Sequence, residues 1–223
     1  MVTESKKGYA SSFDADSQDV HLQSKVRLLR TLDAVRVSLT VLALLMGVAI
    51  LAVSADALSV YNATHVPADF YLPLWPDNFD LRPTVALLAG SSVVVVVNTA
   101  SLLFSRVQSL RNTAPTAHLS VSFAAPLIGL IAAVVAMTLF YAVNASHTVD
   151  TLLSWTCRWS RVAMQQRPHF GSLCRESHVA VYLSILLIPV EAFVLGVAAW
   201  QRVIEGHTSA YARARKASPV ISS

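Results

Sequence analysis

Charged residues are scarce in this chain. Asp, Glu, Lys and Arg make up only 13% of its 223 residues, whereas a soluble domain carries about 25%. Hydrophobic residues make up 54%, and the mean hydropathy is +0.54. This composition argues against a soluble globular domain and favours an integral membrane protein.

The usual signatures of catalysis are also missing. The sequence has no glycine-rich phosphate loop, no nucleophile-elbow serine and no His-Glu-x-x-His pair. The pI of about 9.3 comes from Lys and Arg residues that flank the apolar segments, so nucleic-acid binding is not favoured. We therefore expect no enzymatic activity, no cofactor and no bound metal.

The chain does contain four long uncharged stretches. They are 37–55, 83–105, 112–149 and, interrupted only by Glu191, 177–201. Each is long enough to cross about 30 Å of hydrocarbon at about 1.5 Å per residue, and each should be helical because lipid offers the backbone no hydrogen-bond partners. We predict an all-α integral membrane four-helix bundle.

The predicted spans divide the chain into nine segments. The spans are 37–58, 83–104, 120–144 and 178–201. The remaining segments are a tail at 1–36, an outer loop at 59–82, an inner loop at 105–119, a second outer loop at 145–177 and a tail at 202–223.

The basic residues orient this arrangement. Twelve of the 17 Lys and Arg residues fall in the two tails and the inner loop, and five fall on the opposite side. The positive-inside rule then places both termini in the cytoplasm. The expected localisation is a multi-pass position in the plasma membrane or the endomembrane system.

Two features on the opposite side agree with this orientation. Asn62 begins an Asn-Ala-Thr acceptor pattern for glycosylation, which is used only in a lumenal or extracellular loop. The chain's two cysteines, Cys157 and Cys174, share the second outer loop, where an oxidising compartment favours a disulfide.

The outer loops carry opposite net charges. Loop 59–82 is net acidic by two and loop 145–177 is net basic by two, so we expect them to dock as a small cap. A Cys157–Cys174 disulfide would close the basic part and contribute about 3 kcal/mol. The aromatic residues expected to supply apolar contact are Phe70, Tyr71, Trp75 and Phe79.

Two alternatives remain open in this loop. Its cysteines could instead hold zinc together with His169 and His178, although the spacing matches no familiar ligand pattern. Its arginines could bind an anionic outer ligand, or they could simply be solvated or paired within the protein. These arginines are Arg158, Arg161, Arg167 and Arg175.

Glu191 is the one charged residue inside the fourth span. Counted from the outer ends of their helices, Glu191 and Asn98 differ in depth by only about 3 Å, so we expect Asn98 to be its partner. Small residues should allow the close approach, namely Ala192, Gly196, Ala86, Gly90 and Ser91. Glu191 is then either a packing device or a carboxylate that handles protons or ions.

A basic segment precedes the first span. Residues 20–36 place apolar residues near one helical face, together with four cations. This pattern is typical of a helix lying on anionic lipids of the inner leaflet, and it is equally typical of ordinary positive-inside flanking. The cations are Lys25, Arg27, Arg30 and Arg36.

The plan of four spans, inner tails and a cysteine pair in the last outer loop resembles that of MARVEL-like and tetraspan membrane proteins. The stretches "LPLWPDNFDLRPTVALLAGS" and "HTVDTLLSWTCRW" resemble those of four-span proteins of filamentous fungi. The chain lacks the Cys-Cys-Gly motif of tetraspanins, and its cysteines lie in a different loop from those of claudins. The resemblance implies a role in membrane organisation and carries over no catalytic residues.

Two functions are compatible with these observations. The first is a non-enzymatic membrane protein that organises lipids or partner membrane proteins, or associates with itself. The second is a small proton or cation transporter, channel or channel subunit that uses Glu191.

Overall fold

The computed structural model describes the backbone of residues 7–65, 74–76, 78–106, 115–145, 149–162, 164 and 167–217. It describes the side chains of residues 27–65, 74–76, 78–105, 123–145, 149–162, 164, 167–204 and 206.

Four long helices dominate the chain. They are α1 (Lys7–Thr64), α2 (Arg82–Arg106), α4 (Pro115–Ala145) and α6 (Phe170–Ala217). By length and composition, each contains a segment able to cross a membrane. These segments are Arg27–Thr64, Arg82–Ser105, Phe123–Ala145 and Phe170–Ile204. The predicted all-α class with four long apolar helices is confirmed.

The first and last helices are longer than the predicted spans. α1 continues past residue 58 to Thr64, and α6 begins at Phe170 rather than near residue 178 and runs on to Ala217. No proline lies in α1, so its backbone hydrogen bonds need not stop where its hydrophobicity stops. Hydropathy therefore indicated the spans but not the ends of these helices.

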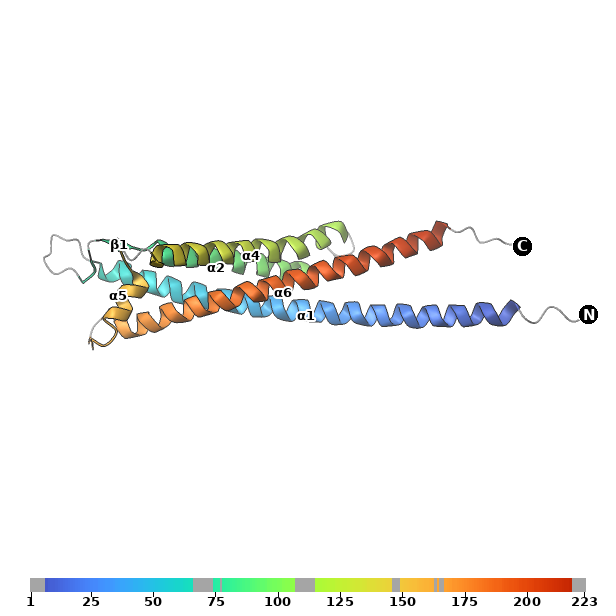
Figure 1. The fold of residues 1–223 in the computed structure, drawn as a ribbon, viewed down its shortest axis with the longest axis horizontal. Helices are drawn as coiled ribbons and strands as arrows, with labels where there is room; N and C mark the ends of the chain where they lie inside the picture. The colour runs from blue at the N-terminus through green and yellow to red at the C-terminus, as the bar shows by residue number, and fades with distance from the viewer. Residues whose placement is uncertain are drawn as a thin grey trace, which may run out of the picture.

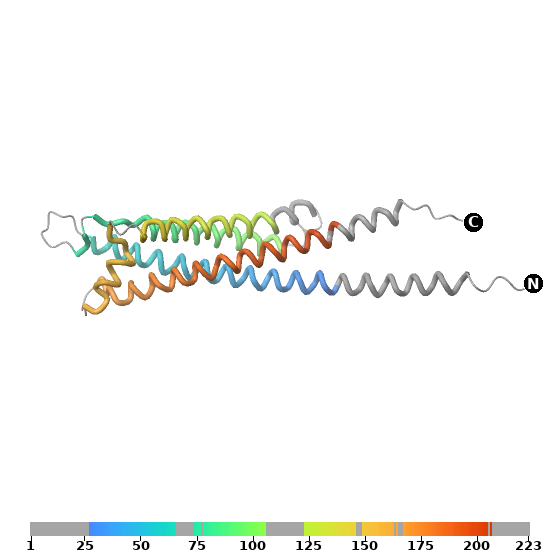
Figure 2. Tube along the Cα trace, viewed as in Figure 1, coloured from blue at the N-terminus to red at the C-terminus, as the bar shows by residue number. Residues whose placement is uncertain are grey.

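The helices form an up-and-down bundle (Figure 1). Both α1 and α4 pack against α2 and against α6, which leaves α2 and α6 facing each other diagonally across the centre. Figure 2 shows α1 and α6 extending beyond α2 and α4 at one end. We call the opposite end, where β1, β2 and α5 lie, the capped end.

The bundle is apolar on its outer surface as well as in its core. Small and medium-sized side chains fill the centre, among them Ala43, Ile50, Leu87, Val94, Ala133 and Ala136. Large apolar side chains also point outward, and Leu45, Val96 and Phe193 are 62%, 66% and 68% exposed. Helices that are hydrophobic all round are typical of membrane spans.

The two loops at the capped end meet through a short strand pair. Strand β1 (Phe79–Asp80) pairs in parallel with β2 (Asp150–Thr151), with Phe79 opposite Asp150. Thr151 then caps helix α5 (Leu152–Arg158), accepting a hydrogen bond from the Ser154 backbone while the Ser154 hydroxyl accepts one from Thr151 N. This reciprocal cap fixes where α5 begins.

An aromatic cluster fixes the first loop to the helices. The Trp75 side chain is buried, and its ring centroid lies 5.0 Å from that of Tyr61 and 5.6 Å from that of Phe170. Phe79 stacks on Tyr61, and Trp75 Nε1 donates to Thr64 Oγ1 at 3.0 Å. The predicted contacts of Trp75 and Phe79 are therefore present, whereas Phe70 and Tyr71 lie outside the described residues.

The expectation that opposite charges dock the loops is wrong for the part of the chain that the structure describes. Arg158 pairs with Asp150 of its own loop, at 3.0 Å, and Asp80 Oδ1 accepts a hydrogen bond from the Arg82 backbone. No ion pair between described residues joins one loop to the other. Burial of aromatic surface and strand pairing hold the loops together instead.

Close approach of α2 and α4 depends on Gly90. A Cβ at this position would lie 2.7 Å from Ala136 Cβ and 3.2 Å from the Ala132 carbonyl oxygen. Gly90 therefore serves the contact with α4, not the contact with α6 that we expected.

We predict that Gly90→Ala lowers the free energy of unfolding by about 1–3 kcal/mol, because the added methyl forces two helices apart. Thermal unfolding in detergent measures the effect. Gly196→Ala is the matched control, since nothing lies within 4 Å of a Cβ there and alanine favours a helix. Equal melting temperatures for the two variants would contradict the close packing.

Candidate functional site

A hydrogen bond crosses the centre of the bundle between Asn98 and Glu191. Asn98 Nδ2 donates to Glu191 Oε1 at 2.7 Å, and the two residues are 1% and 0% exposed. Asn98 belongs to α2 and Glu191 to α6, so the bond joins the two helices that face each other diagonally. The structure thus brings together Asn98 and Glu191, the two residues whose similar depth in the membrane predicted their contact.

Gly129 of α4 makes room for this pair. A Cβ at Gly129 would lie 3.0 Å from Glu191 Cδ and Oε1, and 3.1 Å from Oε2. The carboxyl group therefore lies against the backbone of α4. Any larger residue at this position would displace Glu191.

Two of the four side-chain nitrogen and oxygen atoms of this pair make no hydrogen bond to a described residue. Glu191 Oε2 and Asn98 Oδ1 are buried and have no hydrogen-bond partner among the described protein atoms. A buried carboxylate without a cationic partner is strongly disfavoured, so this site best accommodates a protonated carboxyl or a bound water. Its available chemistry is the gain and loss of a proton.

Sequence reasoning missed a regular series of small polar residues that leads to this pair. Thr84, Ser91 and Asn98 lie seven residues apart on α2, and Ser177, Ser184 and Glu191 lie seven apart on α6. A spacing of seven keeps residues on one face of packed helices. Because α2 and α6 both run away from the capped end, the residues form three successive polar layers, which we number from that end.

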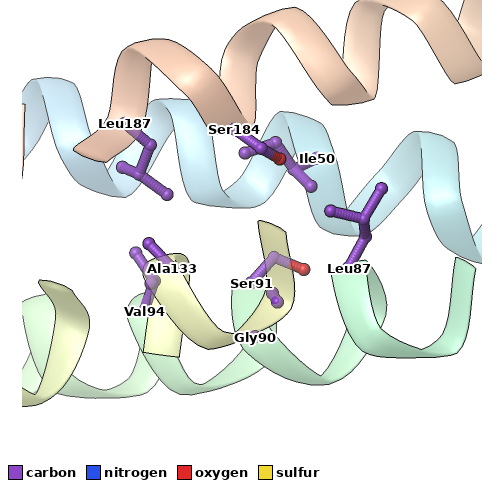
Figure 3. A pocket seen from close by; sticks show the side chains of 9 residues that line it. Ile50, Leu87, Gly90, Ser91, Val94, Ala133, Ser184 and Leu187 are labelled. Atoms are coloured by element: carbon purple, nitrogen blue, oxygen red, sulfur yellow. The ribbon is translucent and has the colours of Figure 1, made fainter. Parts of the chain in front are cut away.

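Small cavities accompany the first two layers. Thr84 and Ser177 line one cavity, together with Ser54 of α1. Ser91 and Ser184 line the next, where Figure 3 shows them on opposite walls. Each cavity has room for about one water molecule.

Two of the expected small residues face away from the pair. Ala192 and Gly196 are exposed on the outside of α6, and nothing lies within 4 Å of a Cβ at Gly196. They cannot serve the internal packing that we predicted. The reason is the helical period, which turns residues one and five positions after Glu191 away from the centre.

The predicted disulfide is present and joins α5 to α6. Cys157 and Cys174 are bonded, with Cα atoms 4.8 Å apart. His178 lies beside them, and its nearest ring nitrogen is within 4.8 Å of both sulfur atoms, but His169 does not join this group. Because both thiols are consumed in the disulfide, this arrangement does not fit the zinc alternative.

The other predicted charged sites have different surroundings. Arg158 pairs with Asp150, whereas Arg161, Arg167 and Arg175 are exposed. At the other end of the bundle Arg27 and Arg30 are exposed, and the side chain of Lys25 lies outside the described residues.

Arg36 departs from its predicted role as a basic residue exposed to the inner leaflet. It is 7% exposed and its Nη2 lies 2.8 Å from Asp33 Oδ1. Asp33 is one turn earlier on the same helix, so the charge of Arg36 is largely compensated within α1.

Asn62, the predicted glycosylation site, is exposed in the last turn of α1. The hydroxyl of Thr64, the third residue of the acceptor pattern, donates to the Val60 carbonyl at 2.7 Å and accepts from Trp75. The acceptor pattern is therefore helical where we expected a loop.

We predict that Asn98→Leu destabilises the bundle by about 1 kcal/mol, because it leaves the buried Glu191 carboxyl without its donor. The measurement is the melting temperature in detergent. Thr99→Leu is the control, since Thr99 is exposed on the same helix. If both variants melt like the wild type, the central hydrogen bond does not stabilise the fold.

Comparison with known proteins places the chain in a family. No curated protein and no solved structure matches it significantly. Residues 4–205, which include all four long apolar segments and the cap, match a domain of unknown function, DUF8762. The chain therefore belongs to the DUF8762 family.

Proposed function

We propose that this protein is a non-enzymatic, four-span integral membrane protein that organises lipids or partner membrane proteins and associates laterally. Both termini are cytoplasmic in this proposal, and the capped end faces the lumen or the cell exterior. The plan resembles that of MARVEL-like and tetraspan proteins, and the membrane is the plasma membrane or one of the endomembrane system.

The outward position of Ala192 and Gly196 carries this proposal. The two residues lie four apart on the exposed face of α6, which also carries the exposed side chains of Phe193 and Trp200. Small residues at this spacing let the backbone of a second membrane helix approach closely, and lipid tails alone require no such gap. The central Glu191, by contrast, is enclosed and offers no surface to a substrate.

Charged groups at the two ends support contacts beyond the apolar belt. The exposed Arg27 and Arg30 suit anionic lipids of the inner leaflet. At the capped end, Arg161 and Arg175 are exposed together with Trp159, a combination suited to a partner protein or an anionic ligand. In this orientation Asn62 is on the side where glycans are added.

We predict that Gly196→Leu weakens lateral association. The protein is labelled with donor and acceptor dyes and reconstituted into liposomes, and energy transfer is measured as the lipid-to-protein ratio rises. The variant should lose energy transfer at a several-fold lower dilution than the wild type, because a leucine blocks backbone approach. Gly206→Leu is the control. Gly206 is also exposed on α6, but the residue four positions before it is Arg202, which is not small. Identical dilution curves for Gly196→Leu and the wild type would refute this role for α6.

A second candidate is a small proton or cation transporter, channel or channel subunit. The observation that favours it is the pair of buried oxygens, Glu191 Oε2 and Asn98 Oδ1, that have no partner among the described residues. Transport proteins place ionisable groups in such positions inside the membrane.

Glu191→Gln separates the two candidates, because glutamine preserves a hydrogen bond but cannot ionise. If the organising role is the whole function, we expect the variant to fold and associate normally, with no pH-dependent flux in proteoliposomes made from either protein. A wild-type flux that titrates with pH and disappears in the variant would establish transport instead.

A further inference from the structure

The three polar layers connect Glu191 to the capped end of the bundle. Leu87 lines both of the cavities, so the cavity at Ser54, Thr84 and Ser177 is directly followed by the cavity at Ser91 and Ser184. One heptad further along α2 and α6 lie Asn98 and Glu191. Polar groups therefore recur at every second turn from the cap to the carboxyl group.

The hydroxyl groups of the second layer are arranged to accept hydrogen bonds from water. Ser91 Oγ donates to the Leu88 carbonyl at 3.0 Å and Ser184 Oγ donates to the Ala180 carbonyl at 2.8 Å. Each hydroxyl has used its one proton and keeps lone pairs directed toward other partners. A water molecule in this cavity would find acceptors on two opposite walls.

The third layer needs such a partner. Glu191 is 0% exposed and Asn98 is 1% exposed, yet Oε2 and Oδ1 have no hydrogen bond to described protein atoms. Buried polar atoms are normally hydrogen-bonded, and where no protein group is within reach the partner is ordered water. The unused oxygens lie at the end of the series in which water-sized cavities occur.

The start of the series is acidic. Glu176 immediately precedes Ser177 of the first layer, and it interacts electrostatically with Asp56 of α1. Asp56 in turn precedes Ala57, which lines the first cavity. Two carboxylates therefore lie beside the first layer, and the Arg175 guanidinium, which also interacts with Glu176, offsets only one of them.

No charged side chain among the described residues forms an ion pair with the Glu191 carboxyl. The groups that face its carboxyl are the Asn98 amide from α2 and the backbone at Gly129 from α4. α4 contains no Asp, Glu, Lys or Arg. The charged residues of α2, Arg82 and Arg106, are its first and last residues, and Arg202 of α6 lies about three turns beyond Glu191. On α1, Arg36 and Asp56 bound the uncharged stretch 37–55, and Arg36 pairs with Asp33.

We propose that water enters the bundle from the capped end along the three polar layers and exchanges protons with Glu191, which makes this carboxyl a proton-binding site connected to that side of the protein. This inference goes beyond the organising role and does not depend on it. Proton exchange requires only a path from one end, whereas transport would require a second path. In the exchange, the protonated carboxyl gives its proton from Oε2 to water and takes up another from water, so both groups end unchanged.

The test follows the acid proton of Glu191 by infrared spectroscopy in the full-length protein in lipid. The carbonyl stretch of a protonated carboxyl shifts when its proton is replaced by deuterium, and its absence in Glu191→Gln assigns the band. After transfer into heavy water, the wild-type band should shift promptly. Absence of this band in the wild type at every pH, or a band that stays unshifted for hours, would overturn the proposal.

A matched pair of variants tests the path. Ser91 and Ser92 are adjacent on α2 and both donate to the Leu88 carbonyl, but only Ser91 lines the cavity. Ser91→Val fills the cavity with methyl groups and should slow the exchange at least roughly tenfold, because the proton must then cross an apolar layer. Ser92→Val should exchange like the wild type.

Ser184→Val provides a second obstruction from the opposite wall of the same cavity, and it replaces Ser91→Val if that variant does not fold. Exchange in folded Ser91→Val or Ser184→Val that is as fast as in Ser92→Val would overturn the path. The wild-type exchange rate tests whether Glu191 exchanges its proton with water, and this test does not require either variant to fold. Loss of lateral association in Gly196→Leu is measured separately, so the two proposals can fail independently.

Discussion

The hydrogen bond between Asn98 and Glu191 constrains the whole bundle. Neighbouring helices are held by many weak apolar contacts, whereas this bond joins α2 and α6, which face each other diagonally across the bundle. A carboxyl group in an apolar core has few acceptable positions, so it fixes the relative depth of α2 and α6 and, through the glycine beneath it, the position of α4. One polar contact thus helps to set the relative depth of three of the four helices.

The capped end solves a different physical problem. Short loops must leave the helices and return without exposing unpaired backbone groups. Here the strand pair satisfies backbone groups, Thr151 caps α5, and Trp75 fills the space between the ends of α1 and α6. The disulfide then ties α5 to α6 at the point where the chain turns back into the bundle. Specific side chains define this end, while general hydrophobicity defines the rest.

Much of this architecture could be predicted because the signals are local. Uninterrupted apolar stretches indicate four helices, the two cysteines of one loop indicate a disulfide, and counting residues from the helix ends pairs Glu191 with Asn98. The ends of α1 and α6 could not be predicted from hydropathy, because a helix continues as long as its backbone remains bonded. The inward position expected for Ala192 and Gly196 was also wrong, since small residues suit an internal contact and an external one equally well.

The polar layers had a usable signal in the spacing of seven on two helices. Single Ser and Thr residues are common in apolar segments, however, so this spacing becomes informative only when the two helices are known to lie side by side.

The pairing of β1 with β2 also affects the order in which the molecule can be completed during synthesis. The helices α1 and α2 follow each other in sequence and can meet as soon as the second has been made. The partner of Phe79 is Asp150, however, so the strand pair must wait until the third long helix has been made and inserted. The cysteines and Phe170 come later still. The cap therefore cannot be completed until three of the four long helices have been made, and its closure marks a chain in which α1, α2 and α4 have reached their final places.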